Sequence, residues 1–247
     1  MELSYYECFK LRLKRVTSYF CLLLVVLLLI PYLFWVMLYR IRHLEEVRKQ
    51  FAKLTADRHQ RPVLLCLNHL TRIDSVILAC AVLPVWQAFF KYSLVMWHVL
   101  DLINLPILSS VLKTLPIIRM GDRKKIRLMQ AKVKYLLNSG DLVVIFPEGT
   151  RSMIGRVDTR DFQYGVGDIL RDLPECRVLC VYLRGDKQTI RSNVPPKDSV
   201  IDISFELIHP TSQLEGLRAS RELATRVVHT LDQMEKKYFA DKSVDRK

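Results

Sequence analysis

The chain of 247 residues lacks several patterns that would define its class at once. Its six cysteines are scattered, and no CxxC or other paired spacing occurs among them. Neither a disulfide framework nor a zinc site is therefore indicated, and reduced thiols facing the cytosol are the simplest interpretation. The serine nucleophile elbow GxSxG is also missing. An enzyme with this sequence would have to activate a nucleophile that its substrate brings.

Acidic residues are outnumbered, with 25 Asp and Glu against 38 Lys and Arg, and the formal net charge is +13. Half of the chain is nevertheless hydrophobic. A chain that is both apolar and basic favours an anionic membrane surface as its partner. Nucleic acid is the alternative, but we find no zinc-finger spacing, no aromatic RNA-binding string and no basic region with heptads. We expect membrane lipids as partners and no nucleic acid.

One long apolar run, Tyr19–Tyr39, contains no charged residue. Its length matches the ~20 residues that a helix needs to cross a bilayer. No small-residue cleavage site follows it, so we expect it to be retained. Pro31 divides the run, so a straight span and a bent or re-entrant hairpin both stay open. We expect an N-terminal hydrophobic membrane-anchor helix or helical hairpin, and a membrane protein with its active site at the cytoplasmic face.

Beyond the anchor, short apolar runs alternate with helical segments. Val63–Leu67 is continuously apolar, as in a strand that is buried on both faces. Arg123–Asn138 has the apolar spacing of an amphipathic helix. The other expected strands are Trp86–Leu94, Pro116–Met120, Asp141–Phe146, Arg177–Leu183 and Val200–Ile208, and the other expected helices are Arg40–Arg58, Thr71–Leu83, two short ones within Trp97–Leu115, and Leu217–Phe239.

This alternation predicts an α/β fold with a mixed sheet flanked by helices. We divide the chain into residues 1–58, which hold the basic N-terminus, the anchor and an interfacial helix, and residues 59–247, which form the catalytic domain.

The string NHLTRID, Asn68–Asp74, places a histidine and an aspartate five positions apart. On one continuous helix these side chains would point ~140° apart. They can meet if His69 lies in the loop after the strand and Asp74 lies in the first turn of a helix that Thr71 caps. Asp74 would then accept a hydrogen bond from Nδ1 of His69, leaving Nε2 as a base. Alternatively, Thr71 and Asp74 form a capping box, and His69 is an ordinary loop histidine.

The string FPEGTRS, Phe146–Ser152, follows the next long apolar strand and puts Glu148 and Arg151 on a turn. Ligands of open α/β sheets bind outside the carboxyl ends of the strands. The planar guanidinium of Arg151 suits a phosphate, and Glu148 can accept from hydroxyls or orient Arg151. The alternative is a surface turn with a salt bridge between these two side chains.

Together the two strings resemble the motifs of a known family. NHLTRID resembles the His–four residues–Asp motif of the glycerolipid acyltransferases, and FPEGTRS resembles their glycerol-phosphate-binding motif. The resemblance covers about Val63–Leu183 and is closest to the PlsC-type lysophosphatidate acyltransferases. It implies that the catalytic residues are His69 and Asp74. It implies a substrate-binding site built from Glu148, Gly149, Thr150, Arg151, Arg119 in a short strand, and Lys91 in AFFKYSL.

The chain departs from the family pattern at two positions. Gln163, in FQYG, replaces a lysine that the family often has, and Cys180, in VLCVYLRG, stands where the fourth motif has a proline. The departure in the fourth motif concerns the acyl-donor contacts that the resemblance implies, and the identity of the acceptor.

The resemblance implies transfer of a fatty acyl group to the free hydroxyl of 1-acylglycerol-3-phosphate, giving phosphatidic acid for phospholipid biosynthesis. The co-substrate would be acyl-CoA or acyl-carrier protein, with no metal and no other cofactor. A lysophospholipid or lyso-ornithine-lipid acyltransferase with a different acceptor headgroup is an alternative. A membrane-tethered binding protein without enzymatic activity is another.

Overall fold

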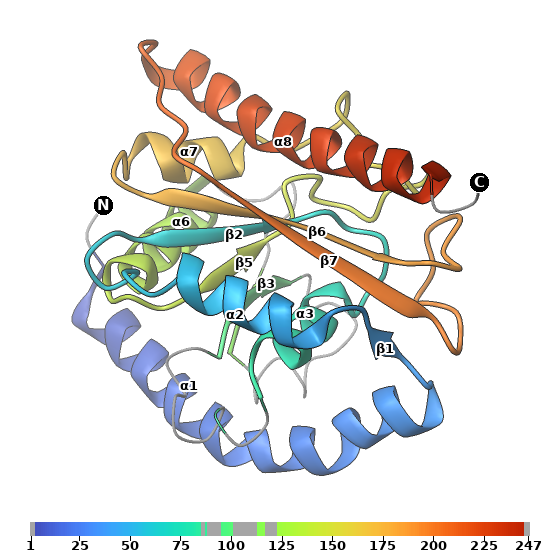
Figure 1. The fold of residues 1–247 in the computed structure, drawn as a ribbon. Helices are drawn as coiled ribbons and strands as arrows, with labels where there is room; N and C mark the ends of the chain where they lie inside the picture. The colour runs from blue at the N-terminus through green and yellow to red at the C-terminus, as the bar shows by residue number, and fades with distance from the viewer. Residues whose placement is uncertain (1–2, 85–86, 88–94, 101–112, 117–122, 245–247) are drawn as a thin grey trace.

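The computed structural model describes residues 3–84, 87, 95–100, 113–116 and 123–244. A seven-stranded sheet crosses the middle of the molecule, with strand order β1-β7-β6-β2-β5-β3-β4 (Figure 1). Its strands are β1 (Arg40–Ile41), β2 (Val63–Leu67), β3 (Trp97–Leu100), β4 (Thr114–Pro116), β5 (Val143–Ile145), β6 (Arg177–Gly185) and β7 (Val200–Ile208).

The sheet is mixed. Strands β6, β2, β5, β3 and β4 pair in parallel, β7 pairs antiparallel to β6, and β1 runs parallel to β7. The predicted α/β fold with a mixed sheet flanked by helices is therefore confirmed. The described helices are α1 (Tyr5–Leu24), the π-helical turns η1 (Val25–Leu29) and η2 (Tyr32–Val36), α2 (Leu44–Leu54), α3 (Asp74–Val82), α6 (Arg123–Asn138), α7 (Gly165–Arg171) and α8 (Gly216–Val244).

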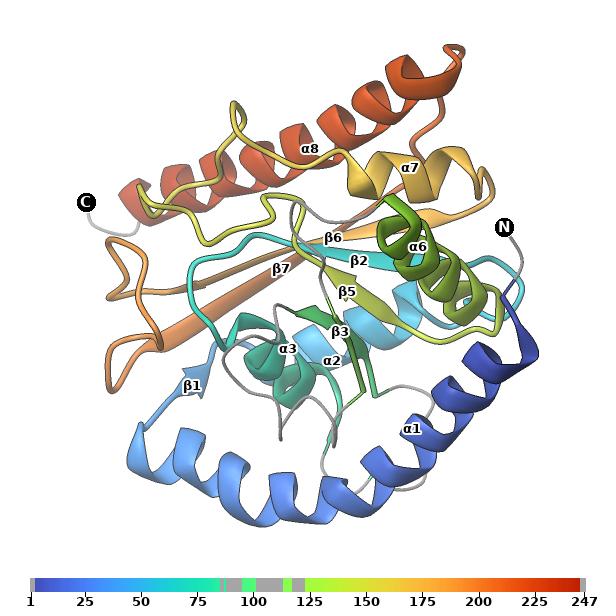
Figure 2. The same cartoon turned by 180° about the vertical axis from the view of Figure 1, so that it is seen from behind.

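Strand β2 shows why the sheet has two cores. All five of its residues are buried, and successive side chains point to opposite faces. Leu64 and Cys66 pack with residues of α6, α7 and α8, whereas Leu65 and Leu67 pack with residues of α2 and α3. Both views show α7 and α8 on one side of the sheet and α2 and α3 on the other (Figures 1 and 2).

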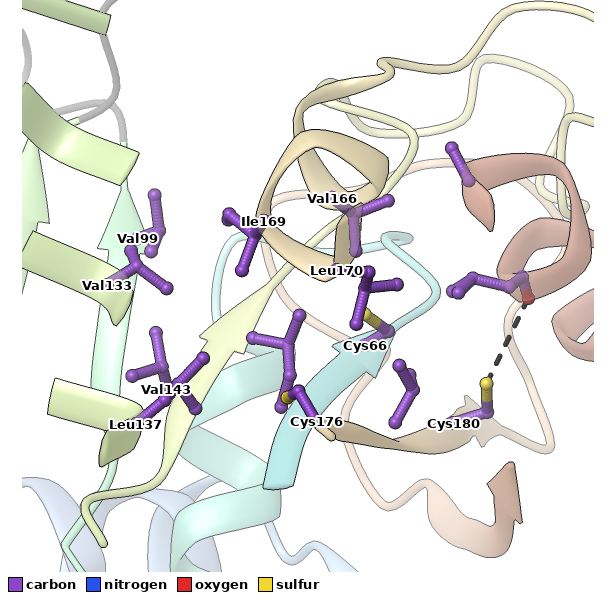
Figure 3. Packing of buried hydrophobic residues seen from close by; sticks show 14 of the residues in the cluster. Cys66, Val99, Val133, Leu137, Val143, Val166, Ile169, Leu170, Cys176 and Cys180 are labelled. Atoms are coloured by element: carbon purple, nitrogen blue, oxygen red, sulfur yellow. Dashed lines mark hydrogen bonds between the residues drawn. The ribbon is translucent and has the colours of Figure 1, made fainter. Parts of the chain in front are cut away.

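The core beneath α7 and α8 also contains three cysteines (Figure 3). Cys66, Cys176 and Cys180 are free and almost fully buried, and burial raises the pKa of each thiol. Cys180 Sγ lies 4.0 Å from the carbonyl oxygen of Val227 in α8. The cysteine that replaces the family's proline is therefore a core residue in β6 that faces α8.

Several elements have the expected bounds. Strands β2 and β7 and helix α6 begin and end where the sequence pattern places them. The expected helix Arg40–Arg58 is shorter, because Arg40 and Ile41 pair with β7 and helix α2 begins only at Leu44.

The segment Trp97–Leu115 was expected to form two short helices, and this prediction is wrong for its described residues. Trp97–Leu100 is strand β3, in register with β5 and β4, and Thr114 begins strand β4. The reason is that a short apolar run does not distinguish a buried strand from a buried helix by periodicity alone. The expected strand Trp86–Leu94 and residues 117–120 of the expected strand Pro116–Met120 lie outside the described residues, apart from Gln87.

The N-terminal apolar run does not form the expected spanning helix. It is divided between the end of α1 and the two π-helical turns, which together make one curved arm that leads to β1 (Figures 1 and 2). Within the described residues, no helix is both long enough and apolar enough to cross a membrane. The first part of α1 carries Lys10, Arg12, Lys14 and Arg15, so these charged residues and only the beginning of the apolar run share one helix.

The arm packs on the sheet through a few contacts. Leu11 is buried in the core, Lys14 Nζ donates to Thr114 Oγ1 at 3.0 Å, and Arg15 forms an ion pair with Asp141. The division at residue 58 stays a prediction.

Candidate active site

The two motif loops meet because their strands are neighbours. β2 and β5 pair in parallel, so the loops that follow them leave the same edge of the sheet. The backbone N–H of His69 donates to Glu148 Oε1 at 3.0 Å, and the N–H of Ser152 donates to the carbonyl of His69 at 2.9 Å. NHLTRID and FPEGTRS therefore form one hydrogen-bonded unit.

Asn68 holds this unit on the sheet. Its side chain is buried, with Oδ1 accepting from the N–H of Leu183 at 2.8 Å and Nδ2 donating to the Leu183 carbonyl at 3.1 Å. The pairing of β2 with β6 ends at Leu67, and the side-chain amide of Asn68 continues it by bonding the backbone of Leu183 in β6. Asn68 was not among the predicted site residues, although it directly precedes His69.

His69 and Asp74 lie as the dyad hypothesis requires. Nδ1 of His69 is 3.2 Å from Oδ2 of Asp74, which lies in the first turn of α3. Asp74 is fully buried, whereas the His69 side chain keeps 16% of its surface exposed. The imidazole also stacks on Phe146, with ring centroids 3.9 Å apart. Since the carboxylate fixes Nδ1 as the donor, Nε2 is left as the acceptor of a proton.

The same carboxylate also ties down its own loop. Oδ2 of Asp74 accepts from the N–H groups of Leu70 and Thr71, both at 2.7 Å, and Oδ1 accepts from the Thr71 hydroxyl. The prediction that Thr71 is the N-cap is wrong. Helix α3 starts at Asp74, with Ile73 at the N-cap. The Thr71 hydroxyl nevertheless donates to the carboxylate of Asp74 and accepts from the Ile73 N–H, and the carboxylate accepts from the Thr71 N–H. The reciprocal contacts that the capping-box alternative expected are therefore present beside the His69–Asp74 contact. Asp74 therefore combines a structural role with its place in the dyad.

Glu148 is an unusual carboxylic acid. It is 4% exposed, and its Oε2 is buried with no hydrogen-bond partner among the described residues. Burial raises the pKa of Glu148 to about 8, so the neutral acid predominates at pH 7. The backbone N–H groups of His69 and Asp158 act against this rise in the pKa, so Glu148 interacts with the backbone of both loops.

Gly149 makes the turn possible. Its φ is +67°, a left-handed conformation that strains other residues, and its N–H donates to the carbonyl of Phe146 at 3.0 Å. A Cβ atom here would lie 2.5 Å from Cγ of Gln163, the residue that replaces the family's lysine. Exposed Thr150 lines a cavity of about 370 Å³ with Gly149, Gln163 and apolar side chains of α6 and α7.

Arg151 does not form the salt bridge with Glu148 that the alternative interpretation expected. Its Nη1 donates to the carbonyl of Ser192 at 2.9 Å and lies 3.3 Å from Oδ1 of Asn193. Both acceptors belong to the loop between β6 and β7, which sequence reasoning did not connect to the site. Lys91 and Arg119, the other predicted substrate-binding residues, lie outside the described residues.

Helix α8 supports the loop that follows FPEGTRS. Oε2 of Glu235 accepts from the N–H of Val157 at 3.1 Å, and Oε1 accepts from the hydroxyl of Tyr182. Arg184 Nη1 donates to the Gly155 carbonyl at 2.7 Å. Sequence reasoning missed Glu235, because its partners are 50 or more residues away along the chain.

Comparison with known protein families identifies the family of this chain. A family model described as Acyltransferase matches residues 39–184, more than half of the chain, and the match includes both motif loops. The chain belongs to the acyltransferase family. No curated protein matches it. The resemblance to the acyltransferases is thus confirmed for the family, and its PlsC-type form stays a prediction.

Proposed function

We propose that this acyltransferase moves a fatty acyl group from acyl-CoA or acyl-carrier protein to the free hydroxyl of 1-acylglycerol-3-phosphate, giving phosphatidic acid. The observation that carries the proposal is the junction of the His69–Asp74 pair with the loop of Glu148 and Arg151. A base and an anion-binding side chain then stand at the carboxyl ends of neighbouring strands, where an acceptor with a hydroxyl and a phosphate can reach both.

In the proposed reaction, Nε2 of His69 takes the proton of the acceptor hydroxyl as its oxygen attacks the thioester carbonyl. Asp74 holds the imidazole in the required tautomer and stabilises the imidazolium. Collapse of the tetrahedral intermediate breaks the carbon–sulfur bond, and the imidazolium returns the proton to the departing sulfur. No acyl-enzyme forms, since the acceptor itself supplies the nucleophile.

The acceptor would be held by its phosphate. The guanidinium of Arg151 suits the phosphate, whereas Glu148 is buried and supports the loop of His69 through Oε1. Arg119 and Lys91 remain predicted partners of the same phosphate.

A membrane location is part of the proposal. Along the arm, large apolar side chains are exposed to an extent that soluble surfaces rarely show. Among them are Phe20, Leu28 and Trp35, whose exposed fractions are 72%, 68% and 78%. With a net charge of +13, such a face suits the headgroup region of an anionic bilayer, where both lipid substrates reside, at the cytoplasmic side.

The test is an assay of the purified full-length protein in lipid vesicles, with acyl-CoA and 1-acylglycerol-3-phosphate, following phosphatidic acid by mass spectrometry. His69→Ala should lose activity ~10²–10⁴-fold. The exposed His229 in α8 provides the matched control, and His229→Ala should retain wild-type turnover.

The outcomes separate the proposal from its alternatives. Preference for a lysolipid without a terminal phosphate would reject 1-acylglycerol-3-phosphate as the acceptor and favour a lysophospholipid or lyso-ornithine lipid. Absence of product with any lysolipid, from either acyl-CoA or acyl-carrier protein, would favour a binding protein.

A further inference from the structure

The loop between β6 and β7 is built into the candidate site. The N–H of Ser192 donates to the carbonyl of Leu70 at 3.2 Å, and the N–H of Arg72 donates to the carbonyl of Asn193 at 3.0 Å. From the other motif, Nη1 of Arg151 donates to the Ser192 carbonyl at 2.9 Å. Three loops that are distant in the sequence therefore meet at one hydrogen-bonded junction.

This junction gathers three arginines, namely Arg72, Arg151 and Arg191. Arg72 and Arg191 are exposed, and Arg151 is partly buried. In the part of the chain that the structure describes, none of the three forms an ion pair with a carboxylate. Burial first, and then the nearby charges of Arg72 and Arg191, lower the pKa of Arg151. Like charges repel one another, and an anion bound among the three guanidiniums would offset this repulsion.

The carboxylates near the junction are engaged elsewhere. Asp74 attracts the charge of Arg151, but its carboxylate is fully buried and accepts hydrogen bonds from the N–H groups of its own loop. In the β6–β7 loop, Asp198 pairs with Lys187 and Arg40, and Asp186 accepts from the N–H of Val200. The positive charge of the junction is therefore left for a ligand.

We propose that Arg72, Arg151 and Arg191 form one binding site for a phosphate monoester. The inference rests on the proposed function and extends it. Arg191 lies outside the matched residues 39–184, and neither it nor Arg72 was among the predicted site residues. Two substrates carry this chemistry, since both the 3-phosphate of the acceptor and the 3′-phosphate of coenzyme A are phosphate monoesters. A dianion among three guanidiniums receives charge-assisted, bidentate hydrogen bonds.

The experiment compares Arg191→Gln, Arg72→Gln and the double variant in the full-length protein, with Arg218→Gln as the matched control. Arg218 is an exposed arginine in the first turn of α8, outside the junction. Each single variant should raise KM for the phosphate-bearing substrate about tenfold, with kcat near wild type, as expected for a lost charge-assisted contact. Arg191→Lys should recover part of the loss, because it keeps the charge without the planar guanidinium.

Two arms identify the source of the phosphate. If the site holds the acceptor, KM for 1-acylglycerol-3-phosphate rises and KM for acyl-CoA does not. If it holds the donor, KM for acyl-CoA rises, and the difference between variant and wild type vanishes with an acyl-dephospho-CoA that lacks the 3′-phosphate. Either pattern supports the site.

A binding measurement that needs no turnover completes the test. Glycerol 3-phosphate and coenzyme A are titrated by calorimetry into the wild type and each variant, and thermal melts verify folding. Arginine-dependent binding without acyl transfer would support the site and reject the proposed function. If the wild type transfers acyl groups while Arg191→Gln and Arg72→Gln match Arg218→Gln in both KM and binding, the phosphate site is rejected and the proposed function stands.

Discussion

Replacing Asp74 by alanine should damage both stability and catalysis, and the structure allows the two effects to be separated. The carboxylate is fully buried and accepts from the N–H groups of Leu70 and Thr71. Each buried donor left without a partner costs about 1–3 kcal/mol, so Asp74→Ala should lower the free energy of unfolding by about 2–6 kcal/mol. For a chain of this size, roughly 2–4 °C of melting temperature is lost per kcal/mol.

His69→Ala should behave differently. It removes one partner from Asp74 and the stacking on Phe146, which together are worth about 1–3 kcal/mol. It leaves the other donors to the carboxylate in place. Its turnover should nevertheless fall ~10²–10⁴-fold, because the base is gone. The measurements are kcat per folded molecule and the melting temperature, on the same preparations.

Thr71→Val is the control for loop stability. It removes the hydroxyl that donates to Asp74 and accepts from the Ile73 N–H, but it keeps the His69–Asp74 pair. We expect a loss of about 1–2 kcal/mol with activity within a few-fold of wild type. If Thr71→Val loses as much activity as Asp74→Ala, or if His69→Ala turns over normally, the reasoning about the dyad is refuted.

Three further predictions concern pH, the sheet and the membrane. Burial raises the pKa of Glu148 to about 8, so between its unfolded pKa near 4.5 and pH 8 the folded state binds more protons and stability falls as pH rises. Glu148→Gln should flatten this decline in urea melts across the window, and an unchanged slope would contradict the assignment. Asn68→Ala should lower the free energy of unfolding, measured in urea, by about 2–4 kcal/mol, because both backbone groups of Leu183 lose their partner. A loss below about 1 kcal/mol would show that water replaces the amide. The full-length protein should stay on membranes in high salt, because its arm exposes large apolar side chains. Sedimentation of membranes measures this, and release by salt alone would show that the basic charge causes the attachment.

The sequence alone predicted several elements whose structure depends on nearby residues. The continuous apolar run of β2 and the helical spacing of α6 predicted these elements with their bounds. The same local logic placed NHLTRID and FPEGTRS at strand ends, because a polar string that directly follows a buried strand must lie at its carboxyl end. The five-residue spacing of His69 and Asp74 also required the loop-to-helix boundary that the structure shows.

Tertiary structure decided what depends on distant partners. Trp97–Leu100 became a strand because β5 lies beside it, and no local pattern separates a buried strand from a buried helix over so few residues. Helix α1 likewise joins a charged stretch to the beginning of the apolar run. A hydropathy pattern separates these two stretches, so it did not predict that one helix contains both. Arg191 reached the catalytic loops only through the pairing of β6 with β7, and Glu235 reached the loop that follows FPEGTRS only through the packing of α8. Local spacing thus determined which residues could react, whereas chain packing determined which charges surround them, because long-range contacts leave no periodic signal in the sequence.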